Sequence, residues 1–408
     1  MTLSISKIME QEKKYCAAPW RSLHLNFEGQ IKTCCAGNPN MLGKHDNGPI
    51  ESILQSDTLK EIKKSIRNGV LHEKYCDGCI RRENITGESE RHWHNNVSED
   101  FDVANASLDE HKPALIDVRW NNTCNLACTY CSSVFSTKWA SIIGQGNSHT
   151  INKQEQQVID YISKHKDFVR EVAMVGGEPL MMKENDRLLD ILPSDVQVTL
   201  ITNCTVDFDR FPVPKKLLAR DNVSWSMSFD NIGERFEYVR WGSSWKQMDK
   251  NITTVANKIK NSSHGGGIHA VYNIYNCTKV CELKEYALKH NLSITWQVVW
   301  GDHLDPSQHN DQIRQLAIDE IHRYRKLHVG SNRPSTNREL DFLSGIEQQL
   351  IKGNTGEATS HGIKELLSPD NLTRSKEFIE FTEKLETEWH PDQKGQFEKL
   401  WPEIARAL

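Results

Sequence analysis

Apolar and polar positions alternate with two different periods along the middle of the chain. Six short segments are rich in branched and aromatic residues, as strands are: residues 115–120, 169–175, 196–202, 223–230, 267–275 and 293–299. Segments with apolar residues three and four positions apart, as in amphipathic helices, lie between them: residues 154–164, 185–192, 210–219, 245–259 and 279–290. Strands that alternate with helices predict an α/β fold, in which helices pack on a parallel sheet.

The two flanks of this region have a different pattern. The N-terminal flank shows one clear amphipathic helix, over residues 55–68, with Leu59, Ile62 and Ile66 on one stripe that continues to Val70. A polar stretch over 95–112 is predicted to be a linker, and the C-terminal flank is predicted to be helical. We therefore expect three domains: an N-terminal domain over 1–105, an α/β domain over 106–305 and a C-terminal helical region over 306–408.

Composition narrows the classes of protein to consider. The chain has 408 residues, a net charge of −5 and 11 cysteines. Its first residues lack the pattern of a signal peptide, and no apolar run reaches the length of a membrane span, so we expect a soluble cytoplasmic protein without a membrane partner. Cysteines in a reducing compartment favour metal ligation over disulfides. The acidic balance argues against nucleic acid as the main partner.

The most informative motif is Cys124-Asn-Leu-Ala-Cys128-Thr-Tyr130-Cys131, which directly follows the first predicted strand. A cubane [4Fe–4S] cluster has four irons, and three cysteines leave one iron open. An open coordination position is what a metal site needs for chemistry. A zinc knuckle is the structural alternative, although no fourth ligand lies at close spacing.

Further polar motifs follow the next predicted strands. A glycine-rich turn comes after the second strand: Gly176, Gly177, Glu178 and Pro179. Two glycines allow the backbone to approach a ligand closely. Asn203 ends the third strand. In the fourth strand Ser226, Ser228 and Asp230 alternate onto one face, which suits recognition of a ribose or a carboxylate.

A second set of cysteines lies in the N-terminal domain. Cys16, Gly29 and Cys34 have the spacing C-x12-G-x4-C, and Cys76 and Cys79 follow after the amphipathic helix. Four thiolates would fully ligate a [4Fe–4S] cluster, whereas a zinc ion bound by four cysteines is the structural alternative. The glycine spacing selects Cys34 as the ligand, with Cys35 as the alternative.

Over residues 115–300 these motifs, in this order, resemble the radical S-adenosylmethionine (SAM) family. The resemblance implies a partial (β/α)6 TIM-like barrel in which Cys124, Cys128 and Cys131 hold a [4Fe–4S] cluster and SAM chelates its open iron. It implies that Arg240 pairs with the SAM carboxylate, for which a guanidinium is well suited. The other residues that it implies at the SAM site are Tyr130, Gly176, Gly177, Glu178, Pro179, Asn203, Ser226 and Ser228.

The N-terminal cysteines resemble the SPASM/twitch auxiliary-cluster domains of many radical SAM enzymes. This resemblance implies an auxiliary [4Fe–4S] cluster on Cys16, Cys34, Cys76 and Cys79. The order departs from the family pattern, because auxiliary domains usually follow the barrel, and no further cysteines are present for a second auxiliary cluster.

The resemblance further implies an enzyme that makes a 5′-deoxyadenosyl radical from SAM and abstracts hydrogen from a substrate. We expect a ribosomally made peptide or a protein as substrate, with a small molecule or a nucleotide as the alternative, and flavodoxin or ferredoxin as electron donor. Candidate catalytic residues are Cys204, Asp230 and Cys277, and for each cysteine the alternative is a buried apolar filler. The alternative from another class is a non-catalytic metal-binding scaffold or sensor.

Overall fold

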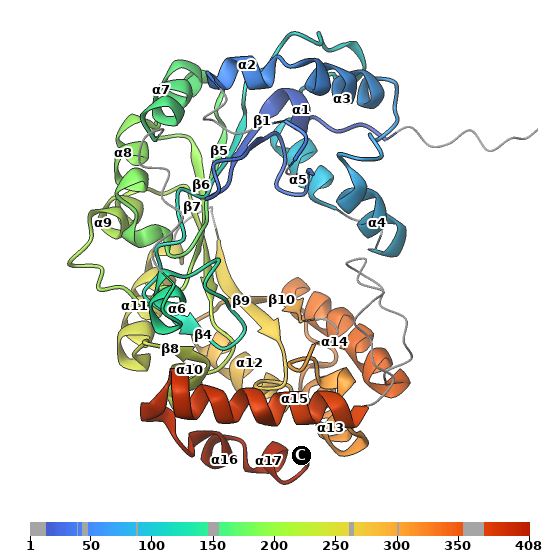
Figure 1. Ribbon diagram of the computed structural model, residues 1–408, viewed down its shortest axis with the longest axis vertical. Coiled ribbons are helices and arrows are strands. Elements are labelled where there is room, and N and C mark those ends of the chain that lie inside the picture. Colours follow the sequence, from blue (N-terminus) through green and yellow to red (C-terminus); the bar gives the residue numbers. More distant parts are fainter. Residues whose placement is uncertain are drawn as a thin grey trace, which may run out of the picture. The chain divides into compact units, whose positions relative to one another are not determined.

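The structure is a computed structural model of the 408-residue chain (Figure 1). It describes residues 14–38, 40–42, 48–86, 89–145, 155–260, 265–299, 302–353 and 371–408, without the side chains of residues 84–86 and 371–373. Within these ranges no helix has both the length and the apolar character needed to cross a bilayer.

The main sheet has eight strands in the order β10-β9-β7-β6-β5-β3-β1-β2. Their bounds are β1 Ser22–Leu25, β2 Ile31–Lys32, β3 Leu115–Val118, β5 Glu171–Met174, β6 Gln197–Thr202, β7 Val223–Ser228, β9 Gly266–Tyr272 and β10 Ser293–Val298. This order has two ends, so in the described part of the chain the sheet is open and does not close into a barrel. A separate two-stranded sheet pairs β4, Ala127–Cys128, with β8, Arg240–Trp241.

The helices connect and flank these strands. The α-helices are α1 Ala18–Arg21, α2 Ile50–Leu54, α3 Asp57–Arg67, α4 Asp77–Thr86, α5 Glu90–Val97, α6 Thr137–Ile142, α7 Glu155–His165, α8 Lys183–Ile191, α9 Pro212–Ala219, α10 Gly233–Val239, α11 Trp245–Ile259, α12 Val280–Lys289, α13 Asp311–His328, α14 Pro334–Lys352, α15 Asn371–Lys384, α16 Gln396–Leu400 and α17 Pro402–Ala405. The predicted α/β class is confirmed. The six predicted strands and the five predicted helices between them are present, with ends that differ by no more than about three residues.

The chain divides into two compact units. Unit 1 consists of Met1–Asn121, Thr150–Ala173 and Asp190–Gln197, and unit 2 of Asn122–His149, Met174–Leu189 and Val198–Leu408. The three domains expected from the sequence remain a prediction.

In unit 1, strand β1 pairs antiparallel with β2 and parallel with β3, where His24 lies opposite Asp117. Helix α3 begins at the N-cap Ser56, whose hydroxyl accepts a hydrogen bond from the backbone of Leu59. Its predicted apolar stripe is fully buried as far as Ile66. Val70, predicted to continue the stripe, is 54% exposed, because the helix ends and the chain turns at Gly69 with φ 81°.

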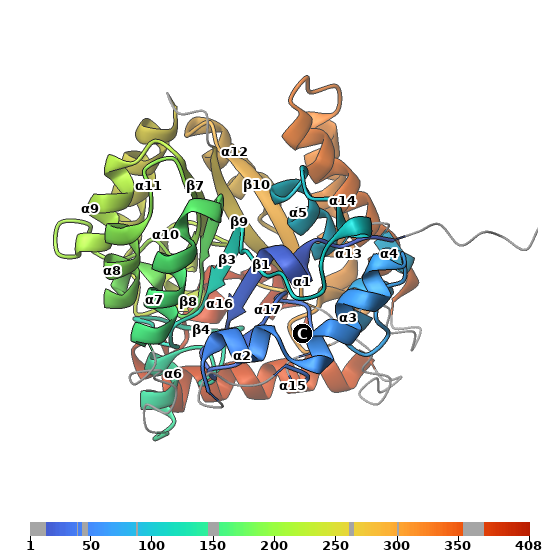
Figure 2. The same cartoon turned by 90° about the horizontal axis from the view of Figure 1, so that it is seen from above.

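In unit 2, strands β6, β7, β9 and β10 run parallel. Figures 1 and 2 both show α9 and α11 on one side of β7 and β9, and α13 and α14 toward β10. The apolar face of β7 is buried through Trp225 and Met227, and the chain beyond it adds Phe229. Trp225 contacts the ring of Phe208, and Phe229 contacts that of Trp245. This core leaves the polar face of β7 available for a site.

Candidate metal and cofactor sites

The three-cysteine loop of unit 2 is fixed by backbone pairing. In the small β4–β8 sheet Cys128 lies directly opposite Arg240, and the backbone N–H of Thr129 donates to the Val239 carbonyl at 2.8 Å. The indole N–H of Trp139 donates to the Cys128 carbonyl at 2.8 Å. The loop is therefore held in shape by protein contacts alone.

The three thiols lie close enough to influence one another's charge. Burial, with further contributions from neighbouring thiols, raises the pKa of Cys124 and of Cys128 to about 12 and that of Cys131 to about 11. Two donors approach the sulfurs: Arg240 Nη1 lies 3.9 Å from Cys128 Sγ, and Asn203 Nδ2 lies 3.8 Å from Cys124 Sγ. Three neighbouring thiols, two of them approached by N–H donors, fit a thiolate-bound metal cluster, whose negative charge such donors stabilise.

The glycine-rich turn packs against this loop. A Cβ on Gly177 would lie 2.3 Å from the carbonyl oxygen of Thr123, and the backbone N–H of Glu178 donates to that same oxygen at 2.7 Å. Gly176 has φ 128°, a conformation that other residues resist. The close approach that Gly177 permits here is to the backbone of the cysteine loop.

Glu178 ties the turn to the end of β6. Its Oε1 accepts hydrogen bonds from the Leu180 N–H at 3.0 Å and the Thr202 hydroxyl at 2.6 Å, and its Oε2 accepts from the Asn203 N–H at 2.7 Å. Burial raises the pKa of Glu178 to about 7. In this arrangement both carboxylate oxygens bind protein groups, so Glu178 positions Asn203 and the turn.

Arg240, Asp230 and Tyr130 form a buried network beside Cys128. Asp230 Oδ2 accepts from the Tyr130 hydroxyl at 2.5 Å and from Arg240 Nε and Nη2, each at 3.1 Å. Asp230 Oδ1 accepts from the Val271 N–H at 2.7 Å. Burial acts against the charged form of Arg240, but Tyr130 and Asp230 hold its pKa above the usual value. The network fixes the guanidinium in one position.

The other predicted SAM-site residues lie on neighbouring strands of unit 2. Ser226 and Ser228 are half-buried on the face of β7 opposite its apolar residues, which confirms the predicted alternation. Asn203 Nδ2 also donates to Asn125 Oδ1 at 2.9 Å, so it joins the end of β6 to the cysteine loop. Pro179 is buried in the short helix that follows the turn.

The candidate catalytic cysteines are deeply buried. Cys204 and Cys277 are both 0% exposed. Cys204 has φ 57°, and the Cys277 thiol donates to the Ile274 carbonyl at 3.4 Å. These surroundings are those of a buried filler, and a hydrogen-donor role for either thiol remains a prediction.

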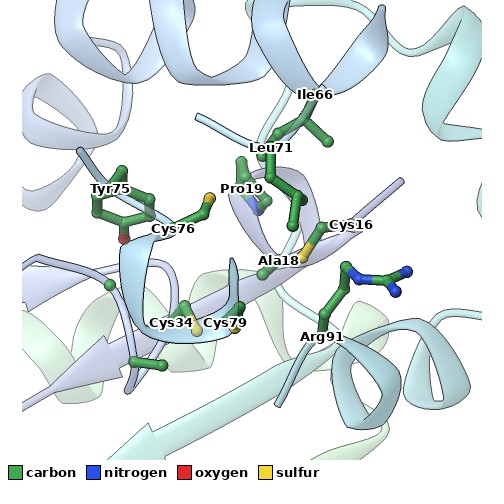
Figure 3. Close-up of a pocket in the computed structure, with 12 residues that line it drawn as sticks. Cys16, Ala18, Pro19, Cys34, Ile66, Leu71, Tyr75, Cys76, Cys79 and Arg91 are labelled. Atoms are coloured by element: carbon green, nitrogen blue, oxygen red, sulfur yellow. The ribbon is translucent and has the colours of Figure 1, made fainter. Parts of the chain in front are cut away.

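In unit 1 the four N-terminal cysteines line one small cavity (Figure 3). Cys16 precedes α1, Cys34 follows β2, and Cys76 and Cys79 lie at the start of α4. Burial raises the pKa of Cys16 to about 12 and that of Cys76 to about 11, whereas a hydrogen bond with Cys34 lowers that of Cys79 to about 6. The structure thus brings together four thiols that are far apart in the sequence.

A cation lies at the wall of this cavity. Arg91 lines it, and Glu83 holds the guanidinium through Nε at 2.7 Å and Nη2 at 3.1 Å. Burial acts against the charged form of Arg91, but Glu83 and then the nearby thiolates hold its pKa above the usual value. A fixed positive charge favours the anionic form of a thiolate-bound centre.

Two residues near Cys34 were either missed or left undecided by the sequence analysis. His94 on α5 and Cys35 lie close to Cys34. A hydrogen bond from Cys34 lowers the pKa of Cys35 to about 4. His94 falls just before the segment that we predicted as a linker. Ser89 at the N-cap of α5, with a capping box to His92, is the sequence signal that could have indicated this helix.

Unit 2 therefore brings three thiols, a glycine-rich turn and a buried arginine together. In a comparison with known families, residues 118–274 match the model of the Radical SAM superfamily. This is a family of enzymes that use a [4Fe–4S] cluster and SAM.

Solved structures with partial similarity include native anSMEcpe with bound AdoMet, at 16% identity and TM-score 0.39, covering 54% of this chain and 62% of that one. Streptococcus suis SuiB bound to S-adenosylmethionine matches at 14% identity and TM-score 0.39, covering 63% of this chain and 60% of that one. SuiB bound to the precursor peptide SuiA matches at 14% identity and TM-score 0.38, covering 53% of this chain and 47% of that one. The chain spans less than two thirds of each of these proteins. No curated protein matches it in sequence.

Proposed function

We propose that this chain is a radical SAM enzyme whose catalytic cluster is held by Cys124, Cys128 and Cys131. The observation that carries the proposal is the convergence of these three thiols with the Gly177 turn and Arg240, inside the region that matches the family. When bound, the reduced cluster and SAM supply a 5′-deoxyadenosyl radical that abstracts hydrogen from a substrate.

The chain's own residues bind and orient the cofactor in this proposal. Arg240 is presented by β8 and Asp230 with one N–H toward Cys128, which suits a SAM carboxylate at the open iron. Asn203 is held at the same loop by Glu178 and Asn125. Ser226 and Ser228 offer hydroxyls for the ribose from the polar face of β7.

We propose further that the cavity of unit 1 holds an auxiliary [4Fe–4S] cluster on Cys16, Cys34, Cys76 and Cys79. All four cysteines line the same cavity, which supports their assignment as ligands of one cluster. Four thiolates leave no open iron. A closed centre can pass electrons or orient a substrate but cannot cleave SAM. A zinc ion on the same four cysteines is the alternative, and measuring the iron and zinc content of the protein would reveal it.

A ribosomally made peptide or a protein is our proposed substrate, and flavodoxin or ferredoxin the proposed electron donor. Both follow from the family resemblance. The substrate is tested by incubating the reduced enzyme and SAM with candidate peptides, and a mass change of the peptide that requires SAM would support it. A change found only in small molecules would overturn the peptide proposal.

The SAM chemistry is tested with Cys128→Ala. Anaerobically reconstituted wild-type protein with dithionite and SAM should release 5′-deoxyadenosine even without substrate, and Cys128→Ala should release none above background, because the cluster loses a ligand. Cys281→Ala is the matched control: this thiol is buried on α12 beside the Glu320 carbonyl, and activity should be retained. Wild-type yield from Cys128→Ala would refute the assignment.

The auxiliary cluster is tested by counting iron. Reconstituted wild-type protein should contain about eight irons per chain, and the double variant Cys76→Ala/Cys79→Ala about four. The double variant should still release 5′-deoxyadenosine, because the catalytic cluster is intact, but should not form product. About four irons in the wild type, with zinc in unit 1, would show a structural site instead.

A further inference from the structure

A second group of metal-binding atoms lies beside the four-cysteine cavity. The sulfur atoms of Cys34 and Cys35 and a ring nitrogen of His94 all lie within 4.8 Å of one another. Tetrahedral zinc, with bonds of about 2.0–2.3 Å, holds its ligand atoms roughly 3.3–3.8 Å apart, so small side-chain shifts would suffice. We propose that Cys34, Cys35 and His94 bind a single divalent ion of the zinc class, in addition to the auxiliary cluster.

His94 is prepared for this role by its surroundings. The side chain is 2% exposed, and its Nδ1 lies 2.7 Å from the Ser22 hydroxyl on β1. Its Nε2 is buried and makes no hydrogen bond to a nitrogen or oxygen atom of the described residues, and the group that acts on it is the Cys35 thiol. A thiol is a weak partner for a buried ring nitrogen, and a metal ion would satisfy both atoms. With the proton on Nδ1, Ser22 fixes the ring as the outer hydrogen-bond partners of metal-bound histidines do.

The cysteines are also held in place. They follow β2, where the Lys32 ammonium donates to the carbonyl oxygens of Cys35 at 2.8 Å and Gly37 at 3.1 Å. Cys35 is partly exposed, so an ion can enter from solvent. The ligands therefore come from a strand end and a helix, both anchored.

The ligand count distinguishes this centre from the cubane. Two thiolates and one imidazole leave the fourth tetrahedral position to water or to a substrate donor. Binding displaces the thiol protons to solvent and involves no electron transfer. Cys34 also lines the four-cysteine cavity, so with the auxiliary cluster in place its thiolate would bridge the two centres. Only this bridging role rests on the proposed function.

The test is the zinc content of the full-length reconstituted protein after incubation with Zn²⁺ and desalting, measured together with iron. The wild type should hold about one zinc and about eight irons per chain. His94→Gln and Cys35→Ser should lose the zinc and keep the iron. Ser22→Ala should weaken zinc binding roughly 10- to 100-fold, because the ring loses its orienting partner. X-ray absorption at the zinc edge should show two sulfur ligands at about 2.3 Å and nitrogen or oxygen at about 2.0 Å.

His322→Gln is the control, since this exposed histidine on α13 pairs only with Glu347 among described groups, and zinc should be retained. No zinc in the wild type, with about eight irons present, would overturn this inference and leave the proposed function standing. A loss of iron in Cys35→Ser would also overturn it, because Cys35 would then be a cluster ligand. Zinc that is kept in His94→Gln but lost in Cys76→Ala/Cys79→Ala would overturn this inference and replace the auxiliary cluster by a four-cysteine zinc site.

Discussion

At the scale of one residue, the contacts of Arg240 fix the direction in which a buried guanidinium points. Its guanidinium donates from Nε and Nη2 to Asp230, and its Nη1 points toward the Cys128 sulfur. A lysine ammonium is a point charge that cannot reproduce this planar arrangement. The planarity, as well as the charge, is therefore expected to matter for the cofactor.

We predict that Arg240→Lys weakens SAM binding about tenfold or more, which corresponds to the loss of a charge-assisted hydrogen bond of about 1.5–3 kcal/mol. Titration of the anaerobically reconstituted protein with SAM measures the change. Arg235→Lys is the control, because Arg235 also forms an ion pair, with Glu282, but lies on α10. Equal SAM affinity in Arg240→Lys and the wild type would remove Arg240 from the cofactor site.

Gly177 is a residue whose lack of a side chain is required by packing. We predict that Gly177→Ala destabilises the protein by about 1–3 kcal/mol and reduces the iron bound by the catalytic site, because the Cβ would meet the Thr123 carbonyl oxygen at 2.3 Å. Urea unfolding and iron analysis measure the two effects. Gly345→Ala, within α14 and with nothing near its Cβ, should be neutral or stabilising. A fully stable, fully loaded Gly177→Ala would show that the two loops can separate without cost.

At the scale of elements, the β1–β2 hairpin lies between Cys16 and Cys34 in the chain and forms one edge of the main sheet. Its turn needs a left-handed residue, which Gly29 supplies with φ 79°. Asn26 stabilises the turn by accepting hydrogen bonds from the backbone of Glu28 and Gln30. The glycine of the C-x12-G-x4-C spacing is therefore explained by hairpin geometry.

We predict that Gly29→Val lowers the free energy of unfolding by about 1–2 kcal/mol, because branched residues resist a positive φ. Gly29→Asn should cost less, since asparagine tolerates that conformation. Chemical denaturation followed by circular dichroism compares the two. Equal costs for Val and Asn would mean that the turn changes conformation.

At the scale of the whole molecule, buried histidines make stability depend on pH. His309 is fully buried, its Nε2 lies 2.8 Å from the His303 carbonyl oxygen, and burial lowers its pKa to about 4. An unfolded histidine titrates near 6.5. Between these values the unfolded chain binds a proton that the folded protein does not, so the free energy of unfolding falls as the pH falls.

We predict that His309 contributes about 2 kcal/mol to the loss of stability between pH 7 and pH 5. His309→Gln should be less stable than the wild type at pH 7 but should lose less on acidification. Urea unfolding at both pH values gives the difference, and His322→Gln, exposed on α13, should leave the pH dependence unchanged. The same loss in His309→Gln as in the wild type would assign it to other groups.

The order of strands and helices could be predicted because it depends on local periodicity. The alternation in residues 223–228 placed Ser226 and Trp225 on opposite faces, as the structure has them. Strand β1 was missed, since its four buried residues include Ser22 and His24 and show no alternation. Helix α5 was missed because its one fully buried side chain is His94, which gives no apolar stripe.

The sequence by itself determined the α/β class and the spacing of the triplet Cys124, Cys128 and Cys131, because each depends on residues near one another in the chain. Only the tertiary structure decided what Gly177 packs against, which groups occupy the oxygens of Glu178 and Asp230, and that Cys35 faces His94. These contacts join segments far apart in the chain. Their geometry depends on how β-α units pack, and a one-dimensional pattern does not encode that packing.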